Sequence, residues 1–127
     1  MSTKHILPGK IGLGGAPLGN MYRAIPEEEA LATVTSAWDL GIRYFDTAPL
    51  YGSGLSEIRM GEALSQYPRD EFVLSTKVGR IMLDEMEDPA ARDLGEKGGL
   101  FEHGLKNKIL NDYSEDGTLR SIENSLK

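Results

Sequence analysis

The chain has 127 residues, enough for one domain at most, and it contains no cysteine, which excludes disulfides and thiolate metal sites. Its 14 basic and 20 acidic side chains give a net charge of −6, the wrong sign for binding a phosphate backbone, so we exclude nucleic acid as a partner. No apolar stretch approaches the roughly 18 residues of a membrane span and no signal-peptide pattern opens the chain, so we expect a cytoplasmic protein without a membrane partner.

The first two predicted elements precede residue 42. A short strand within residues 5–20 ends in a glycine-rich loop. A helix then begins at Pro26, whose missing N–H costs nothing at the first helical position, and the glutamates at residues 27–29 favour the positive end of the helix dipole. Gly41 closes the helix, and the apolar residues before it recur at helical spacing (Ala30, Leu31, Val34, Ala37 and Trp38).

Two further strands flank a second helix. A strand at residues 42–45 stops at Asp46, and a strand at residues 72–76 delivers Lys77 at its end. The helix between them ends at Pro68 and places three apolar or small residues on one face (Ile58, Gly61 and Leu64). The alternation of strands and helices predicts an α/β fold with parallel strands, in either a doubly wound sheet or a barrel.

The last third of the chain has a different character. We interpret residues 81–115 as a long loop, since acidic residues and glycines are mixed there with scattered apolar residues. A third helix is predicted after Ser114 or Asp116 as its cap, and we expect the chain to end within it (apolar residues Leu119, Ile122 and Leu126). Because this helix and the strand at residues 72–76 lack partners for their apolar faces, the sequence is typical of a fragment.

Three ionisable side chains are predicted to meet at the carboxyl ends of the strands. Asp46 and Lys77 each follow a strand, and in a parallel α/β fold these ends share one rim, where active sites lie. Tyr51 lies in the loop that leaves the Asp46 strand. An ammonium favours the ionised form of a neighbouring phenol and lowers its usual pKa of about 10, and a carboxylate keeps that ammonium charged. The three side chains therefore predict an acid/base unit for a carbonyl or alcohol substrate.

Two other kinds of site find little support in the sequence. The glycine-rich loop fails the dinucleotide fingerprint, because Gly12 and Gly14 fit it but Pro17 stands where the last glycine belongs. We expect its backbone to let a flat ring approach rather than to hold a phosphate. His5 and His103 are too far apart for a local metal motif, so we predict two surface histidines and no metal.

Three motifs resemble those of the aldo-keto reductases. The segment GIRYFDTAPLYGSG at residues 41–54 resembles the signature of that family, and LSTKVG at residues 74–79 resembles its strand with the catalytic lysine. The opening GLGGAPLG at residues 12–19 resembles the first strand and loop, in a spelling similar to that of the bacterial aldose and pyridoxal dehydrogenases. The resemblance implies that residues 1–127 are the N-terminal part of a single barrel domain, the first three units of a (β/α)₈ TIM barrel.

The resemblance also implies an activity. It points to an NAD- or NADP-dependent oxidoreductase that acts on the aldehyde or hemiacetal carbon of a sugar or a pyridoxal-like molecule. Tyr51 would then be the general acid/base, Lys77 would tune it, and Asp46 would support Lys77. Tyr22, together with Tyr51, would line the pocket for this small-molecule substrate.

The cofactor site and the rest of the barrel follow from the same resemblance. Gly15 and Ala16 match positions beside the nicotinamide, and Asp46 would also contact its ribose. The family's catalytic histidine has no counterpart here, since His103 lies in the acidic loop. We therefore expect the chain to be inactive alone, or to act in an oligomer or with a complementing chain. A truncated interaction protein and a small flavodoxin-like binding domain remain as alternatives.

Overall fold

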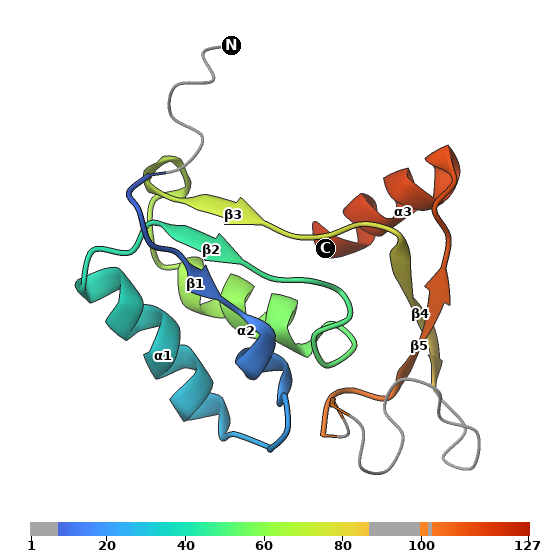
Figure 1. Ribbon diagram of the computed structural model, residues 1–127, viewed down its shortest axis with the longest axis horizontal. Coiled ribbons are helices and arrows are strands. Elements are labelled where there is room, and N and C mark those ends of the chain that lie inside the picture. The colour runs from blue at the N-terminus through green and yellow to red at the C-terminus, as the bar shows by residue number, and fades with distance from the viewer. Residues whose placement is uncertain (1–7, 87–99, 102) are drawn as a thin grey trace.

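The computed structural model describes residues 8–86, 100–101 and 103–127 (Figure 1). His5 lies outside the described residues, and so do three glycines of the long loop expected at residues 81–115 (Gly95, Gly98 and Gly99). The elements, in chain order, are β1 (Leu13–Gly14), a 3₁₀ turn η2 (Ala16–Gly19), α1 (Glu27–Asp39), β2 (Tyr44–Asp46), α2 (Leu55–Leu64), a 3₁₀ turn η3 (Arg69–Glu71), β3 (Val73–Ser75), β4 (Arg80–Met86), β5 (Asn107–Asn111) and α3 (Glu115–Ser125).

The larger sheet is parallel and has the strand order β1-β2-β3. Leu13 pairs with Phe45, and Phe45 pairs in turn with Leu74. Helices α1 and α2 provide the crossovers between successive strands, which parallel pairing requires, and both lie on the same face of the sheet (Figure 1). The predicted α/β class and parallel strands are therefore confirmed.

Helix α1 begins one residue later than predicted. Pro26 has the extended conformation of an N-cap, with φ −60° and ψ 150°, and the three glutamates that follow it form the first turn. The helix closes where the sequence predicts, because Leu40 is its C-cap and Gly41 follows. Acidic side chains in the first turn interact favourably with the helix dipole, which accounts for this start.

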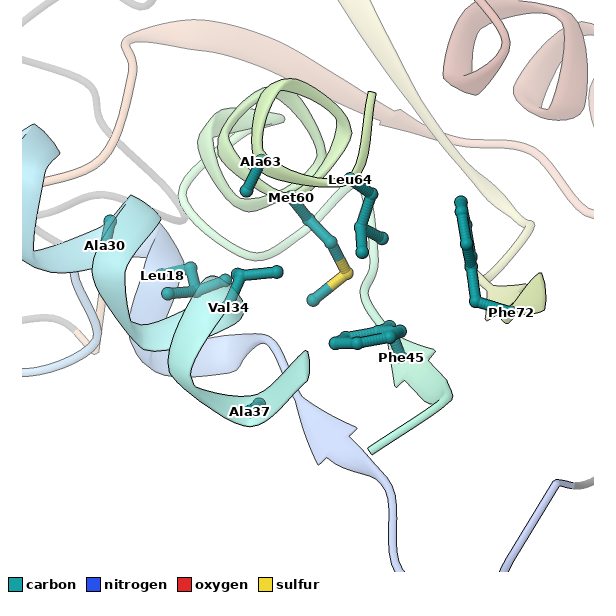
Figure 2. Close-up of a cluster of buried hydrophobic side chains, with 9 residues drawn as sticks. All are labelled: Leu18, Ala30, Val34, Ala37, Phe45, Met60, Ala63, Leu64 and Phe72. Atoms are coloured by element: carbon teal, nitrogen blue, oxygen red, sulfur yellow. The ribbon is translucent and has the colours of Figure 1, made fainter. Parts of the chain in front are cut away.

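Strand alternation decides which side chains of β2 join the core. Phe45 is fully buried on the helix side, so Tyr44 and Asp46 project from the opposite face. Figure 2 shows Met60 of α2 reaching toward Phe45, with Val34 of α1 beside it. The hydrophobic core therefore lies between the helices and one face of the sheet, and among the described residues nine buried side chains form it (Leu18, Ala30, Val34, Ala37, Phe45, Met60, Ala63, Leu64 and Phe72).

The buried face of α2 differs from the predicted one. Leu64 is buried as expected, but the Ile58 side chain is 53% exposed and Gly61 is exposed. Ser56 and Met60 share the face of Leu64 at four-residue spacing, and Arg59 is buried beside them. The prediction of an Ile58 and Gly61 stripe was wrong because it followed apolar residues alone, whereas a serine and an arginine are buried here.

The interpretation of residues 81–115 as a long loop was wrong at residues 81–86 and 107–111, which form strands, whereas residues 87–99 and 102 lie outside the described residues. Strands β4 and β5 form an antiparallel pair that lies apart from the parallel sheet, with Ile81 opposite Leu110 and Met82 opposite Ile109 (Figure 1). Ile81 and Phe101 are buried, whereas Leu100, Leu105 and Leu110 remain exposed. Pairing between segments so distant in sequence leaves no short-range signal, because the hydrogen bonds that define it are not local.

Helix α3 packs beside β4 and starts at its predicted cap. The Ser114 hydroxyl accepts a hydrogen bond from the Gly117 N–H at 3.0 Å. The helix extends to Ser125, and Leu126, its C-cap, still donates an N–H to the Ile122 backbone oxygen at 3.1 Å. Its predicted apolar stripe is largely exposed (Leu119, Ile122 and Leu126). Among the described residues, no helix has the length and apolar character of a membrane span.

Candidate active site

Asp46 and Lys77 meet because β2 and β3 are parallel neighbours. Asp46 is the last residue of β2, and Lys77 lies two residues beyond the end of β3. Parallel strands bring their carboxyl ends to one rim of a sheet, so the side chains that follow them converge. The Asp46 side chain also lies on the face opposite Phe45, away from the core. The local sequence thus places a carboxylate and an amine together at a solvent-accessible edge.

The Lys77 amine is held by two acceptors. Its Nζ donates to Asp46 Oδ2 at 2.7 Å and to the backbone oxygen of Thr47 at 2.9 Å. The side chains of Lys77 and Asp46 remain 48% and 33% exposed. Pairing at this exposure contributes little to folding, about 1 kcal/mol or less, so its main effect is to fix the position and charge of the amine.

The charge states of both groups follow from these contacts. Desolvation raises the pKa of the Asp46 carboxyl, but hydrogen bonds from Lys77 and Ser75 outweigh it and hold that pKa below its usual value. Desolvation likewise lowers the pKa of Lys77, but hydrogen bonds with Asp46 and Tyr51 outweigh it and raise that pKa above its usual value. Both groups are therefore charged at neutral pH.

Tyr51 lies against the Lys77 amine, as predicted from its place in the loop. The Lys77 Nζ is 4.8 Å from the centre of the Tyr51 ring. The Tyr51 ring also stacks with Phe101, with the ring centres 5.8 Å apart. The Tyr51 N–H donates to the backbone oxygen of Ala48 at 3.1 Å, which holds the loop in a turn. The structure therefore brings the three predicted side chains together, while their catalytic roles stay predictions.

A second hydrogen-bonded chain reaches Asp46 from the sheet. Ser75 Oγ donates to Asp46 Oδ1 at 2.6 Å and lies 3.0 Å from the Tyr44 hydroxyl. Because the single hydroxyl proton of Ser75 goes to the carboxylate, the Tyr44 hydroxyl must be the donor to Ser75. Neither Tyr44 nor Ser75 was predicted as a site residue, although their strand positions place them on the same face as Asp46.

We expect Ser75→Ala to raise the pKa of Asp46 toward its usual value, because one of the bonds that lower it is lost. A lowered carboxyl pKa adds stability that is complete above the unfolded-state pKa, about 4, and is lost as the pH falls through the folded-state pKa. The variant should therefore be less stable than the wild type near neutral pH, and the difference should fade in acid. NMR titration of the carboxyl carbons measures the change directly. Ser65→Ala, whose hydroxyl bonds only the Glu62 backbone, is the control, and an unchanged Asp46 midpoint in Ser75→Ala would contradict the prediction.

Hydrogen bonds of the Gly15 backbone connect the C-terminal ends of β1 and β2 with the first turn of α2. The Gly15 N–H donates to the Asp46 backbone oxygen at 2.7 Å, and its own backbone oxygen accepts from Ser56 Oγ at 2.7 Å. Thr47 Oγ1 lies 2.8 Å from Ser56 Oγ and completes this buried network. A Cβ at Gly15 would lie 2.8 Å from Ser56 Oγ and 2.9 Å from both Asp46 O and the Met60 methyl. A glycine is needed here because the protein's own atoms fill the space.

Gly15→Ala should destabilise the chain by about 1–3 kcal/mol, the usual cost of overpacking a filled site. Gly61→Ala is the matched control, because a Cβ there would meet no atom within 4 Å. Replacing a glycine inside a helix should stabilise by about 0.5–1 kcal/mol. Urea unfolding followed by Trp38 fluorescence measures both. Equal changes in the free energy of unfolding for the two substitutions would mean that the contacts around Gly15 do not exclude a side chain there.

A cavity of about 250 Å³ opens beside Tyr51 and Lys77. Its polar lining comes from Tyr51, Lys77, Arg80 and Tyr113, and residues 48–50 and Val78 complete the wall. This volume lies just below the range of about 300–1,000 Å³ that is usual for drug-sized ligands, and it suits a small molecule. Arg80 is the first residue of β4 and Tyr113 lies between β5 and α3, and neither was predicted as a site residue.

The remaining predicted site residues lie away from this cavity. The Tyr22 side chain is 77% exposed and is not part of the cavity lining, and its N–H donates to the backbone oxygen of Leu100 at 2.8 Å. Ala16 begins η2 and is partly buried. His103 is exposed. The described part of the chain holds no cluster of three metal-ligating side chains. The roles of Tyr22 and Ala16 stay predictions.

Comparison with known proteins shows which family this chain belongs to. Residues 10–127 match the Aldo/keto reductase family. The chain is 57% identical over 72 residues to a D-threo-aldose 1-dehydrogenase from a Pseudomonas species, covering 57% of this chain and 22% of that protein. It is 41% identical over 118 residues to a pyridoxal 4-dehydrogenase from Microbacterium luteolum, covering 91% of this chain and 34% of that protein.

Solved structures agree with the sequence matches. The chain resembles a glycerol dehydrogenase from Gluconobacter oxydans with a TM-score of 0.62 and 28% identity. The match covers 91% of this chain and 30% of that protein. An aldo-keto reductase from Bacillus halodurans, in its holo form, gives a TM-score of 0.63 at 28% identity and the same two coverages. The chain thus spans about a third or less of the proteins it matches. A flavodoxin-like domain is not favoured by these matches, and the chain belongs to the Aldo/keto reductase family.

Proposed function

We propose that these residues are the proton-transfer part of an NAD- or NADP-dependent oxidoreductase. Its substrate would be the aldehyde or hemiacetal carbon of a sugar or a pyridoxal-like molecule. The contact of Asp46, Lys77 and Tyr51 beside a 250 Å³ cavity carries the proposal. The names of two relatives, an aldose dehydrogenase and a pyridoxal dehydrogenase, support the substrate class.

Each of the three side chains has a separate task in the proposed reaction. The Tyr51 hydroxyl exchanges a proton with the substrate oxygen at the reacting carbon. The Lys77 ammonium stabilises the tyrosinate that forms when Tyr51 acts as an acid, and Asp46 holds that ammonium in place through the 2.7 Å bond. The nicotinamide, when bound, supplies or accepts the hydride.

The end of β1 fits the nicotinamide end of such a cofactor. Gly14 is exposed, and a side-chain carbon there would meet no atom within 4 Å, so the backbone leaves room for a flat ring. We propose Gly15 and Ala16 as neighbours of that ring, with Asp46 near the ribose. Gly15 is buried by its own chain, so it would act by shaping the backbone.

The test requires the remainder of a barrel. We suggest joining residues 1–127 to the part of the Microbacterium luteolum pyridoxal 4-dehydrogenase that follows the match, and we call this protein the joined barrel. Reduction of NAD or NADP should be followed with D-arabinose, L-fucose and pyridoxal as substrates. The proposal predicts turnover of at least one substrate by the joined barrel and none by the 127-residue chain alone. A folded joined barrel that is inactive with all three substrates and both cofactors would overturn it.

A further inference from the structure

The loop that carries Tyr51 continues in an unfavourable backbone conformation. The three residues that follow it all have a positive φ, which is 71° at Gly52, 53° at Ser53 and 96° at Gly54. A residue with a side chain, such as Ser53, is strained in this region, and the strain persists only where the surrounding structure fixes the backbone. The position of the Tyr51 ring therefore depends on the groups that pack against this loop.

A segment between β4 and β5 packs against the loop. We call its described residues, 100–101 and 103–105, the Phe101 segment. The Leu105 N–H donates to the Gly52 backbone oxygen at 2.9 Å. Gly104 lies so close to Gly52 that a Cβ at Gly104 would be 2.5 Å from the Gly52 Cα. The Phe101 segment thus contacts the strained backbone of the loop.

The ring of Phe101 also contacts the ring of Tyr51. The ring centres lie 5.8 Å apart, and the ring planes differ by 30°. The Lys77 Nζ lies 4.8 Å from the centre of the same Tyr51 ring. Phe101 is only 7% exposed and is not part of the cavity lining. Phe101 is therefore placed to act on the position of Tyr51 and not on a ligand in the cavity.

The Phe101 segment is also anchored to the chain that leaves η2. The Tyr22 N–H donates to the Leu100 backbone oxygen at 2.8 Å. The Asn20 Nδ2 donates to the His103 backbone oxygen at 2.8 Å, and Asn20 itself is buried. Figure 1 shows the Phe101 segment, in orange, next to this part of the chain. The two anchors lie on either side of Phe101 in the sequence, so they hold its ring in place.

We infer that Phe101 is a positioning residue of the acid/base group and that it holds the Tyr51 ring beside Lys77. The inference rests on the proposed function and adds a residue to it. A proton transfer needs the hydroxyl at a fixed distance from the substrate oxygen, and a misplacement of about 1 Å can lower a rate by about 100-fold. A strained loop alone does not supply this precision, whereas a buried ring with anchors on both sides does.

Phe101→Leu in the joined barrel should lower kcat by about 10–100-fold, because the smaller side chain no longer supports the whole Tyr51 ring. KM for the substrate and the affinity for NAD or NADP should change little, since Phe101 does not line the cavity. Phe72→Leu is the matched control, because Phe72 is also 7% exposed and also contacts an aromatic ring, that of Phe45, at 6.2 Å. Both variants lose part of a buried ring, so both melting temperatures should fall, but Phe72→Leu should keep the wild-type kcat.

A second measurement needs no turnover. In the NMR spectrum of the wild-type 127-residue chain, nuclear Overhauser effects should connect the Tyr51 ring protons with the Lys77 side chain. We expect these signals to weaken in Phe101→Leu and to persist in Phe72→Leu. A general loosening of the fold would weaken them in both variants, so the comparison separates a positioning role from a structural one.

Gly104→Ala tests the same contact from the backbone side. Its Cβ would push the Phe101 segment away from Gly52, so the signals between Tyr51 and Lys77 should weaken as they do in Phe101→Leu. Gly61→Ala is the control, because a Cβ at Gly61 would meet no atom within 4 Å, and it should leave these signals unchanged.

The two measurements also separate this inference from the proposed function. Wild-type signals between Tyr51 and Lys77 in Phe101→Leu, or a wild-type kcat of that variant in an active joined barrel, would overturn the inference. Equal losses in Phe101→Leu and Phe72→Leu would also overturn it. A wild-type joined barrel without activity would overturn the proposed function instead, and the NMR signals would still decide whether Phe101 holds the Tyr51 ring.

Discussion

Replacing Tyr51 by phenylalanine should lower kcat of the joined barrel by about 10²–10⁴-fold, the contribution usual for a general acid or base. The substitution removes one oxygen and keeps the ring, so the contact with Phe101 and the position of the loop should persist. The affinity for NAD or NADP should change little, because the hydroxyl acts on the substrate. Steady-state kinetics and a fluorescence titration of the reduced cofactor measure the two quantities.

Tyr67→Phe is the matched control for this prediction. Tyr67 stacks on Trp38, with ring centres 3.9 Å apart, and does not line the cavity. The kcat of the joined barrel that carries Tyr67→Phe should stay at the wild-type value. If Tyr51→Phe and Tyr67→Phe retain the same activity, another group must transfer the proton.

Arg59→Met should lower the free energy of unfolding of the 127-residue chain by about 2–5 kcal/mol. The Arg59 side chain is buried, and its guanidinium group donates to the backbone oxygens of Leu18 and Ile25 at 2.9 and 3.1 Å. It also donates to Asn20 Oδ1 at 2.9 Å and to Glu27 Oε2 at 2.7 Å. Methionine fills similar space but leaves buried acceptors unpaired, each of which costs about 1–3 kcal/mol.

Arg23→Met provides the comparison for Arg59→Met. Arg23 also pairs with a glutamate, Glu29, at 3.0 Å, but its side chain is 69% exposed. Its loss should cost less than about 1 kcal/mol, the typical value of a surface ion pair. Urea unfolding followed by Trp38 fluorescence measures both variants. Similar losses in the two would show that the four bonds of Arg59 add nothing beyond an exposed pair.

The case of Arg59 also explains why the buried face of α2 could not be predicted. A sequence pattern assigns apolar residues to the core and arginine to the solvent. Arg59 is buried because its four acceptors come from residues 18–27, which run from η2 to the first residue of α1. This segment packs against α2 only in the tertiary structure. Ile58 has no such neighbours and stays exposed.

The candidate site was more predictable than the fold around it. Asp46 and Lys77 follow parallel strands, and the geometry of such strands brings their ends together whatever packs elsewhere. Ser75 was predictable by the same alternation that separates Phe45 from Asp46, yet it was not singled out. Arg80 was not predictable, because its position depends on the β4/β5 pair.

By itself, the sequence determined the parallel α/β order, the caps that end α1 and start α3, and the meeting of Asp46, Tyr51 and Lys77. These features depend on local patterns or on a strand geometry common to all parallel sheets. Only the tertiary structure decided that β4 pairs with β5, that Arg59 is buried, and that Arg80 is one of the residues lining the cavity. Each of these depends on contacts between segments far apart in the chain, which no local pattern encodes.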